Sequence, residues 1–335
     1  MTELDSTAKL QVTPLPPAAV GGIGGLGFLA PLMLKLRDLA VLLLALVTLL
    51  FLLLPQAGDP AQVLAGMDAT SEQIAAIRAK YGLDQPLYVQ YVRYWSNVLQ
   101  LDFGTSLASG QPAMGVVLSH LPATLLLAGL AMGFTICVSV PMGAWLGFRP
   151  DVPSRRFSAW LVFVLQGVPG FVFGLVLIQI FAVNLRWLPS FGYDEVKSWI
   201  LPTLSLSFFL VPKLTRVVAA NVAEAMREDF VRTARAFGAS RMAILWRHAL
   251  PNALLGAAAL VGTQFAFLLS GAVIIERIFG WPGIGWLLIE RTQTLDFPVV
   301  QALAMLIAVM VFTVNTVTDM SFRFLDPRIR SGTTR

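Results

Sequence analysis

The stretch Leu39-Ala-Val-Leu-Leu-Leu-Ala-Leu-Val-Thr-Leu-Leu-Phe-Leu-Leu-Leu54 determines what kind of fold this chain can adopt. Lys35 and Arg37 flank its start, and Pro55 closes it. A bilayer is crossed by roughly 20 apolar residues of helix, and backbone groups in hydrocarbon must be satisfied within helices or closed barrels. Because the run is continuous and does not alternate with polar residues, we predict a membrane-spanning helix over 35–55.

The rest of the chain has the same character. Of its 335 residues, 56% are apolar and only 13% are charged, against about 25% charged residues in soluble domains. The net charge of +5 lies in short segments between apolar runs, which argues against nucleic acid as a partner and for the lipid bilayer. We predict an all-α integral membrane protein whose five further spans cover about 121–148, 157–183, 199–218, 252–275 and 299–322.

The polar segments differ in character. The N-terminal segment combines an acidic start with prolines and a glycine-rich run, which predicts a flexible extension. After the first span, Thr70 with Gln73 forms a capping-box pattern and Gly82 offers a stop, so we predict an ordered segment with a surface helix. The predicted organisation is an extension over 1–34, a first span over 35–55, an external segment over 56–118, a membrane core over 119–326 with a polar loop at 219–251, and a tail over 327–335.

Lysine and arginine are distributed unequally between the two ends of a six-span bundle. Of the 24 such residues, 17 fall on the side that holds both termini, the short loop 149–157 and the segment 219–251. The positive-inside rule therefore predicts a cell inner membrane protein with both termini in the cytoplasm and the segment 56–118 in the periplasm.

The segment 219–251 predicts a helical hairpin. Acidic residues lead and arginines follow, as the helix dipole favours. Phe230, Ala234 and Phe237 have the spacing of one helix face, and Gly238 suits a left-handed stop between two helices. The apolar stripe must be buried either against the bundle itself or against a soluble partner, and the spacing leaves both open.

The same segment resembles the cytoplasmic coupling loop of ABC importer permeases. Arg232-Thr-Ala-Arg-Ala-Phe-Gly238 departs from the general Glu-Ala-Ala signature but is similar to the form found in the dipeptide, oligopeptide and nickel branch, as is His248-Ala-Leu-Pro251. The resemblance extends over about Lys35–Arg330. Further similar motifs are Gly58-Asp-Pro60, Tyr81-Gly-Leu-Asp-Gln-Pro86, Asp102-Phe-Gly-Thr-Ser106, Leu121-Pro-Ala-Thr124 and Phe279-Gly-Trp-Pro-Gly-Ile-Gly285.

The resemblance implies a type I, six-helix permease bundle with cytoplasmic coupling helices. It also implies a homologous second permease subunit, two ATP-binding subunits and an extracytoplasmic substrate-binding protein as partners. The chain lacks a phosphate-binding loop ending in Gly-Lys-Ser/Thr, so we expect a non-catalytic subunit that binds no cofactor, with ATP and Mg²⁺ on partner subunits. Dipeptides, oligopeptides, nickel chelates and glutathione all remain open as cargo.

The candidate site residues form three groups. Those expected to dock on and couple to the ATPase are Arg227, Glu228, Phe230, Arg232, Thr233, Ala234, Arg235, Phe237 and Gly238. A pathway or hinge role is predicted for Gln166, Pro169 and Gly170, with a packed kink as the alternative. A partly re-entrant outer gate within 276–298 would use Trp281, Pro282 and Gly283, with an interfacial helix as the alternative.

Two other function classes are less well supported. A secondary, ion-coupled transporter needs ionisable residues near the membrane midplane, which the predicted spans lack. A membrane-embedded hydrolase needs a nucleophile and a base at one depth. His120 and His248 lie at span edges on opposite sides, which argues against that pairing and against a metal site.

Overall fold

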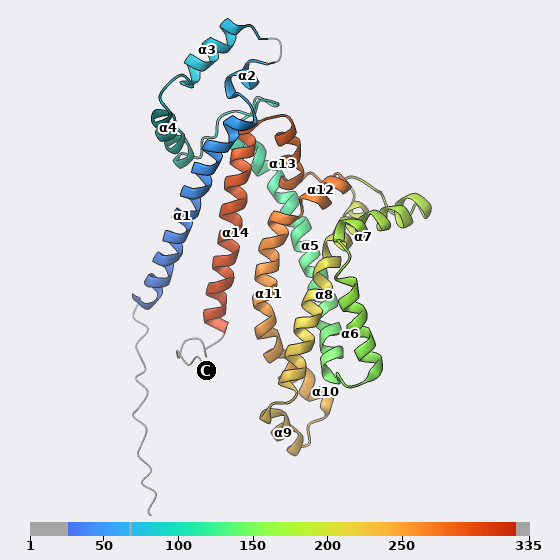
Figure 1. The fold of residues 1–335 in the computed structure, drawn as a ribbon. Helices are drawn as coiled ribbons and strands as arrows, with labels where there is room; N and C mark the ends of the chain where they lie inside the picture. Colours follow the sequence, from blue (N-terminus) through green and yellow to red (C-terminus); the bar gives the residue numbers. More distant parts are fainter. Residues whose placement is uncertain (1–25, 67–68, 326–335) are drawn as a thin grey trace, which may run out of the picture.

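The computed structural model describes residues 26–66 and 69–325, and within them every regular element is a helix (Figure 1). This confirms the predicted all-helical class. Helices long and apolar enough to cross a membrane cover Met33–Leu53, Ala113–Phe148, Val196–Ala225, Arg241–Ser270 and Phe297–Ser321.

The first span begins earlier than the sequence predicts. Helix α1 (Leu26–Ala57) includes residues 26–34, so the prediction of a flexible extension is wrong for these residues. Residues 1–25, the rest of the predicted extension, lie outside the described chain. Lys35 therefore lies inside α1 and does not mark its start. The helix can hold this charge because the Lys35 ammonium group donates to the Asp319 carboxylate of α14 (Phe297–Leu325) at 2.6 Å. This pair joins the first and last long helices at one end of the bundle (Figure 1).

Three short helices form the opposite end: α2 (Pro60–Ala65), α3 (Ser71–Tyr81) and α4 (Leu87–Leu99) (Figure 1). The predicted surface helix is α3. Its capping box is complete, since the Thr70 hydroxyl accepts from the Gln73 amide and the Gln73 side chain accepts from the Thr70 amide. Gly82 ends α3 at a φ of 67°, as a left-handed stop requires.

The third predicted span is interrupted. It consists of α6 (Pro153–Leu165) and α7 (Gly170–Leu177), which continues as a π-helix over Ile178–Asn184. Pro169 is extended, with a φ of −60° and a ψ of 135°, and the missing amide of a proline favours such a break. The prediction of one continuous span over 157–183 is therefore wrong, whereas the other five predicted spans are present.

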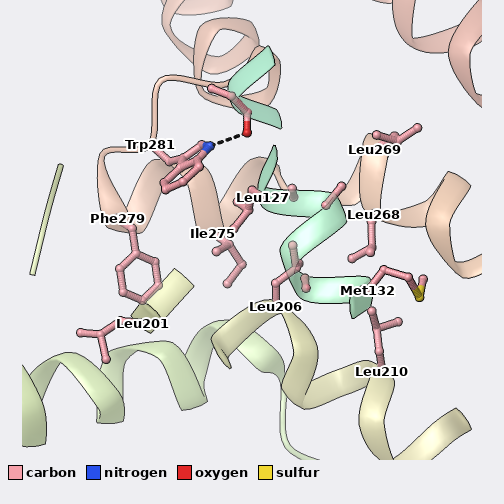
Figure 2. Packing of buried hydrophobic residues seen from close by; sticks show 14 of the residues in the cluster. Leu127, Met132, Leu201, Leu206, Leu210, Leu268, Leu269, Ile275, Phe279 and Trp281 are labelled. Atoms are coloured by element: carbon pink, nitrogen blue, oxygen red, sulfur yellow. Dashed lines mark hydrogen bonds between the residues drawn. The ribbon is translucent and has the colours of Figure 1, made fainter. Parts of the chain in front are cut away.

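Helices α5 (Ala113–Phe148) and α8 (Ile200–Ala225) pack against each other at the centre of the bundle. A 3₁₀ turn over Val196–Trp199 precedes α8. Small residues allow the close approach, as is usual between membrane helices. A Cβ on Gly143 would lie 2.7 Å from the Val218 Cβ, and one on Gly147 would lie 2.4 Å from the Ala219 carbonyl oxygen. Figure 2 shows the apolar core around this crossing, drawn with Leu127, Met132, Leu201, Leu206, Leu210, Leu268, Leu269, Ile275, Phe279 and Trp281.

The polar hairpin beyond α8 contains α9 (Asp229–Ala236) and α10 (Arg241–Ile244). A π-helical stretch over Leu245–Ala249 then joins α10 to α11 (Leu250–Gly271) without a break. Pro251 follows this π-helical stretch directly, in which the Leu250 amide donates to the Leu245 carbonyl, and the helix continues through the proline. Two short helices, α12 (Val273–Phe279) and α13 (Ile284–Gln293), lead to α14.

Candidate functional site

The hairpin at the end of α8 is built as the sequence predicts. Gly238 has a φ of 83°, and its amide donates to the Arg235 carbonyl at 2.9 Å. The Ala239 amide reaches back to the Ala234 carbonyl at 3.1 Å, which completes a Schellman motif. The Ser240 hydroxyl then accepts from the amide three residues on and starts α10. These local hydrogen bonds hold α9 and α10 as a hairpin that projects from the bundle (Figure 1).

The apolar stripe predicted on α9 is divided between two environments. Phe230 packs against the core cluster formed by the ends of α5, α8 and α11, next to the buried Val231. Phe237 is 87% exposed. It is the C-cap residue, with a ψ of 7°, so it leaves the helical geometry on which the predicted spacing relied. Phe230 is partly buried and packs on its own bundle, so the two phenylalanines do not share one environment, and a docking role for Phe230 stays a prediction.

Exposed charged and polar side chains lie on α9 and just before it, on the same hairpin as Phe237. The exposed members of this predicted docking rim are Arg227, Glu228, Arg232, Thr233 and Arg235. Arg232 forms an ion pair with Asp229 at 3.4 Å, but both side chains are more than 80% exposed, so the pair adds little stability. An aromatic anchor inside a solvated rim is typical of a protein–protein interface.

A second site lies at the other end of the bundle, between α12 and α13. Glu276 is fully buried, and its carboxylate accepts three hydrogen bonds. The donors are the Thr124 hydroxyl of α5 at 2.7 Å and the amides of Gly285 and Trp286 at 2.8 and 3.0 Å. Burial raises the pKa of the Glu276 carboxyl above its usual value, and these hydrogen bonds offset part of the rise.

The Glu276 side chain caps the N-terminus of α13, although it does not occupy the N-cap position. The residue at the cap position is Gly283, which has no side chain to offer. Glu276 accepts from the second and third amides of α13, while the Thr124 hydroxyl oxygen accepts from the first, that of Ile284, at 2.9 Å. A Cβ on Gly283 would lie 2.3 Å from a Glu276 carboxylate oxygen, so this cap requires glycine there. The negative charge also suits the positive end of the helix dipole.

The predicted gate residues Trp281, Pro282 and Gly283 form the turn between α12 and α13. The Trp281 side chain is fully buried, and its indole N–H donates to the Ala123 carbonyl of α5 at 2.9 Å (Figure 2). Its ring stands edge-on to that of Tyr193, with 4.8 Å between the centroids. The apolar composition that suggested a re-entrant loop is thus explained by packing within this chain.

Asp296 fastens the polar segment after α4 to the start of α14. This carboxylate is fully buried and accepts from the Ser106 hydroxyl at 2.6 Å and from the Leu107 amide at 3.1 Å. The Arg291 guanidinium lies 3.8 Å away. Sequence analysis missed both Glu276 and Asp296 as organising residues. Their only signal was a carboxylate in a largely apolar stretch.

The predicted hinge residues Gln166, Pro169 and Gly170 lie at the break between α6 and α7. Immediately after the break, the Gly170 carbonyl accepts from the Ser205 hydroxyl of α8 at 2.9 Å. The structure therefore contains the packed kink that the sequence offered as the alternative. Movement at this point stays a prediction.

The described chain thus combines an interrupted span, five long apolar helices and a helical hairpin at one end of the bundle. The fold is similar to that of a chain from the methionine ABC transporter MetNI in inward-facing conformations, with a TM-score of 0.53. That likeness covers 64% of this chain and 97% of the other, at 16% identity, and concerns the fold alone.

The chain belongs to the family of binding-protein-dependent transport system inner membrane components. The family matches residues 139–331, and its N-terminal part matches residues 28–128. Similar relatives are the glutathione transport system permease proteins GsiC of Salmonella paratyphi A, 37% identical over 87% of this chain and 94% of that protein, and of Escherichia coli, 36% identical over 82% and 89%. This chain is a permease subunit of an ATP-driven importer, as its resemblance predicts.

Proposed function

We propose that this subunit docks on an ATP-binding subunit through the α9 hairpin, with Phe237 as the anchor. The observation that carries the proposal is the contrast between two phenylalanines on one short helix. Phe230 is partly buried and packs against the core of the bundle, whereas Phe237 is 87% exposed among charged residues. Because α9 packs on the bundle through one side chain and exposes another, a movement of a soluble partner bound to α9 can be transmitted to α8 and α11.

Exchanging the two phenylalanines for serine separately tests this docking. We expect Phe237→Ser to reduce ATPase co-purification and stimulated ATP hydrolysis while leaving the thermal stability of the chain unchanged. Phe230→Ser should lower thermal stability, because it removes core packing. Phe191→Ser is the matched control, since Phe191 is also exposed, at 65%, but precedes α8. Normal association and hydrolysis in Phe237→Ser would contradict the proposal.

The family to which the chain belongs supports a wider set of partners. We infer one homologous second permease subunit, two ATP-binding subunits and an extracytoplasmic substrate-binding protein. ATP and Mg²⁺ would be held by the ATP-binding subunits, so that this chain is non-catalytic and binds no cofactor. The α12–α13 turn and the break at Pro169 are the places where an outer gate and a hinge would act.

Sidedness follows from charge. The end of the bundle that holds α9, Lys35 and Asp319 carries most of the lysines and arginines, which supports a cytoplasmic location for that end. In a Cys137→Ala background, Ser71→Cys should react with an impermeant maleimide from outside, and Ser240→Cys only after the membrane is opened. The reverse pattern would overturn the orientation.

The cargo is a peptide-like small solute, and glutathione is the first candidate. The relatives named glutathione transport system permeases support this, because they align over most of this chain. Uptake of labelled glutathione by proteoliposomes that contain the whole transporter should be saturable and ATP-dependent. If unlabelled dipeptides compete for uptake and unlabelled glutathione does not, the cargo is another peptide-like solute rather than glutathione.

A further inference from the structure

A cavity of about 640 Å³ lies where the turn after α5 meets the end of α8 and the α9–α10 hairpin. Four arginines line it, and each comes from a different element. Arg149 caps the end of α5, Arg227 follows α8, Arg235 lies on α9 and Arg241 begins α10. Among the lining residues, Asp151 is the only acid.

The four guanidinium groups have no ion-pair partner within 4.0 Å in the part of the chain that the structure describes. Arg149 lies over the ring of Phe148, 5.6 Å from its centroid. A neighbouring hollow shares Arg227 and is lined by Glu224, Glu228 and Asp229, whose negative charges offset that arginine. The positive charge of the cavity therefore comes from the other three arginines. Like charges that converge without partners favour an anion between them.

The cavity lies at the end of a helix long and apolar enough to span a membrane. Its wall includes Gly147 and Phe148, the last residues of the span Ala113–Phe148. Beside it, α6 exposes Phe157 and Trp160, which are 64% and 57% accessible. The Arg155 guanidinium packs against Trp145, 5.0 Å from the ring centroid. Aromatic and arginine side chains in this arrangement mark the depth of lipid headgroups.

We propose that this cavity binds the phosphate headgroup of an anionic phospholipid from the adjacent leaflet. The guanidinium fork matches phosphate oxygens in pairs, and basic pockets beside membrane helices take anionic headgroups. The acyl chains would lie along the exposed apolar face of α6. A headgroup shared by Arg149 and Arg241 would join the turn after α5 to the base of the α9–α10 hairpin. The site depends neither on the sidedness nor on the cargo of the transporter.

Lipid retention tests the proposal. The full-length chain, with the subunits that co-purify, is placed in nanodiscs of phosphatidylcholine alone or mixed with phosphatidylglycerol, and native mass spectrometry counts the lipids kept after mild delipidation. The parent should retain phosphatidylglycerol in preference to phosphatidylcholine. Arg149→Gln with Arg241→Gln should weaken that retention about 10- to 30-fold. Neither residue belongs to the predicted docking rim.

Arg156→Gln with Arg247→Gln is the matched control, because it removes the same charge from the first turn of α6 and from the stretch after α10, and neither residue lines the cavity. It should retain phosphatidylglycerol like the parent. Arg149→Lys with Arg241→Lys keeps the charge and the fold and should give an intermediate result. Equal retention in the Gln pair and its control would overturn the proposal. So would displacement of the lipid by inorganic phosphate, or loss of ATPase co-purification from the Gln pair with lipid retention unchanged.

Discussion

Replacing Glu276 by alanine removes one acceptor group on which three buried donors depend. These are the Thr124 hydroxyl and the amides of Gly285 and Trp286, all within 3.0 Å of the carboxylate. Each donor left unsatisfied in a buried site costs about 1–3 kcal/mol. Part of this is returned, because the variant no longer has to bury a carboxylate whose pKa burial raises. We expect a net loss of about 3–5 kcal/mol in the free energy of unfolding.

Two measurements report this loss. Thermal unfolding followed by tryptophan fluorescence should show a Tm lower by roughly 6–20 °C, at about 2–4 °C per kcal/mol. Hydrogen exchange at the Gly285 and Trp286 amides should accelerate by about 100-fold or more, because they lose their acceptor. Glu276→Gln keeps one acceptor oxygen and turns an amide N–H₂ towards a donor, so it should cost about 1–3 kcal/mol.

Glu195→Gln is the matched control, since Glu195 is exposed and its loss removes the same charge. It should leave Tm and exchange unchanged. If Glu276→Ala unfolds at the temperature of the parent, and the first amides of α13 remain protected, then the carboxylate is not the cap and the argument from its hydrogen bonds is wrong.

Three further substitutions test other parts of the fold. Gly238→Val should lower the free energy of unfolding by about 1–2 kcal/mol through its φ of 83° alone, because a Cβ there meets no atom within 4 Å. Stimulated ATP hydrolysis should fall in this variant. Gly238→Asn should keep that activity, because asparagine tolerates this φ. Gly262→Ala places its Cβ 2.2 Å from Thr318 side-chain atoms and should lower stability by about 1–3 kcal/mol, whereas Gly133→Ala, which has open space, should not. Asp296→Asn replaces one of the two acceptor oxygens with an amide N–H₂, so it leaves one of the two donors unsatisfied and should speed amide exchange in residues 105–107. Unchanged exchange would contradict this.

The features that the sequence alone determined are those that depend on neighbouring residues. Membrane spans follow from runs of apolar side chains, because hydrocarbon rejects polar groups whatever the rest of the fold does. The capping box before α3 and the left-handed stop at Gly238 follow from side chains and dihedral preferences a few residues apart. The family could be predicted for the same reason, since its motifs are short and ordered along the chain.

Tertiary structure decided which side of each element is buried and which distant groups meet. Phe230 and Phe237 have the spacing of one helix face, yet the packing of α9 against the ends of α5, α8 and α11 places Phe230 against the core and leaves Phe237 in solvent. Glu276 accepts a hydrogen bond from Thr124, 152 residues away in the sequence, and Asp296 accepts one from Ser106, 190 residues away. Spacing along the chain carries no information about such pairs, because the free energy of a hydrogen bond depends on distance and burial, which exist only once the helices have packed.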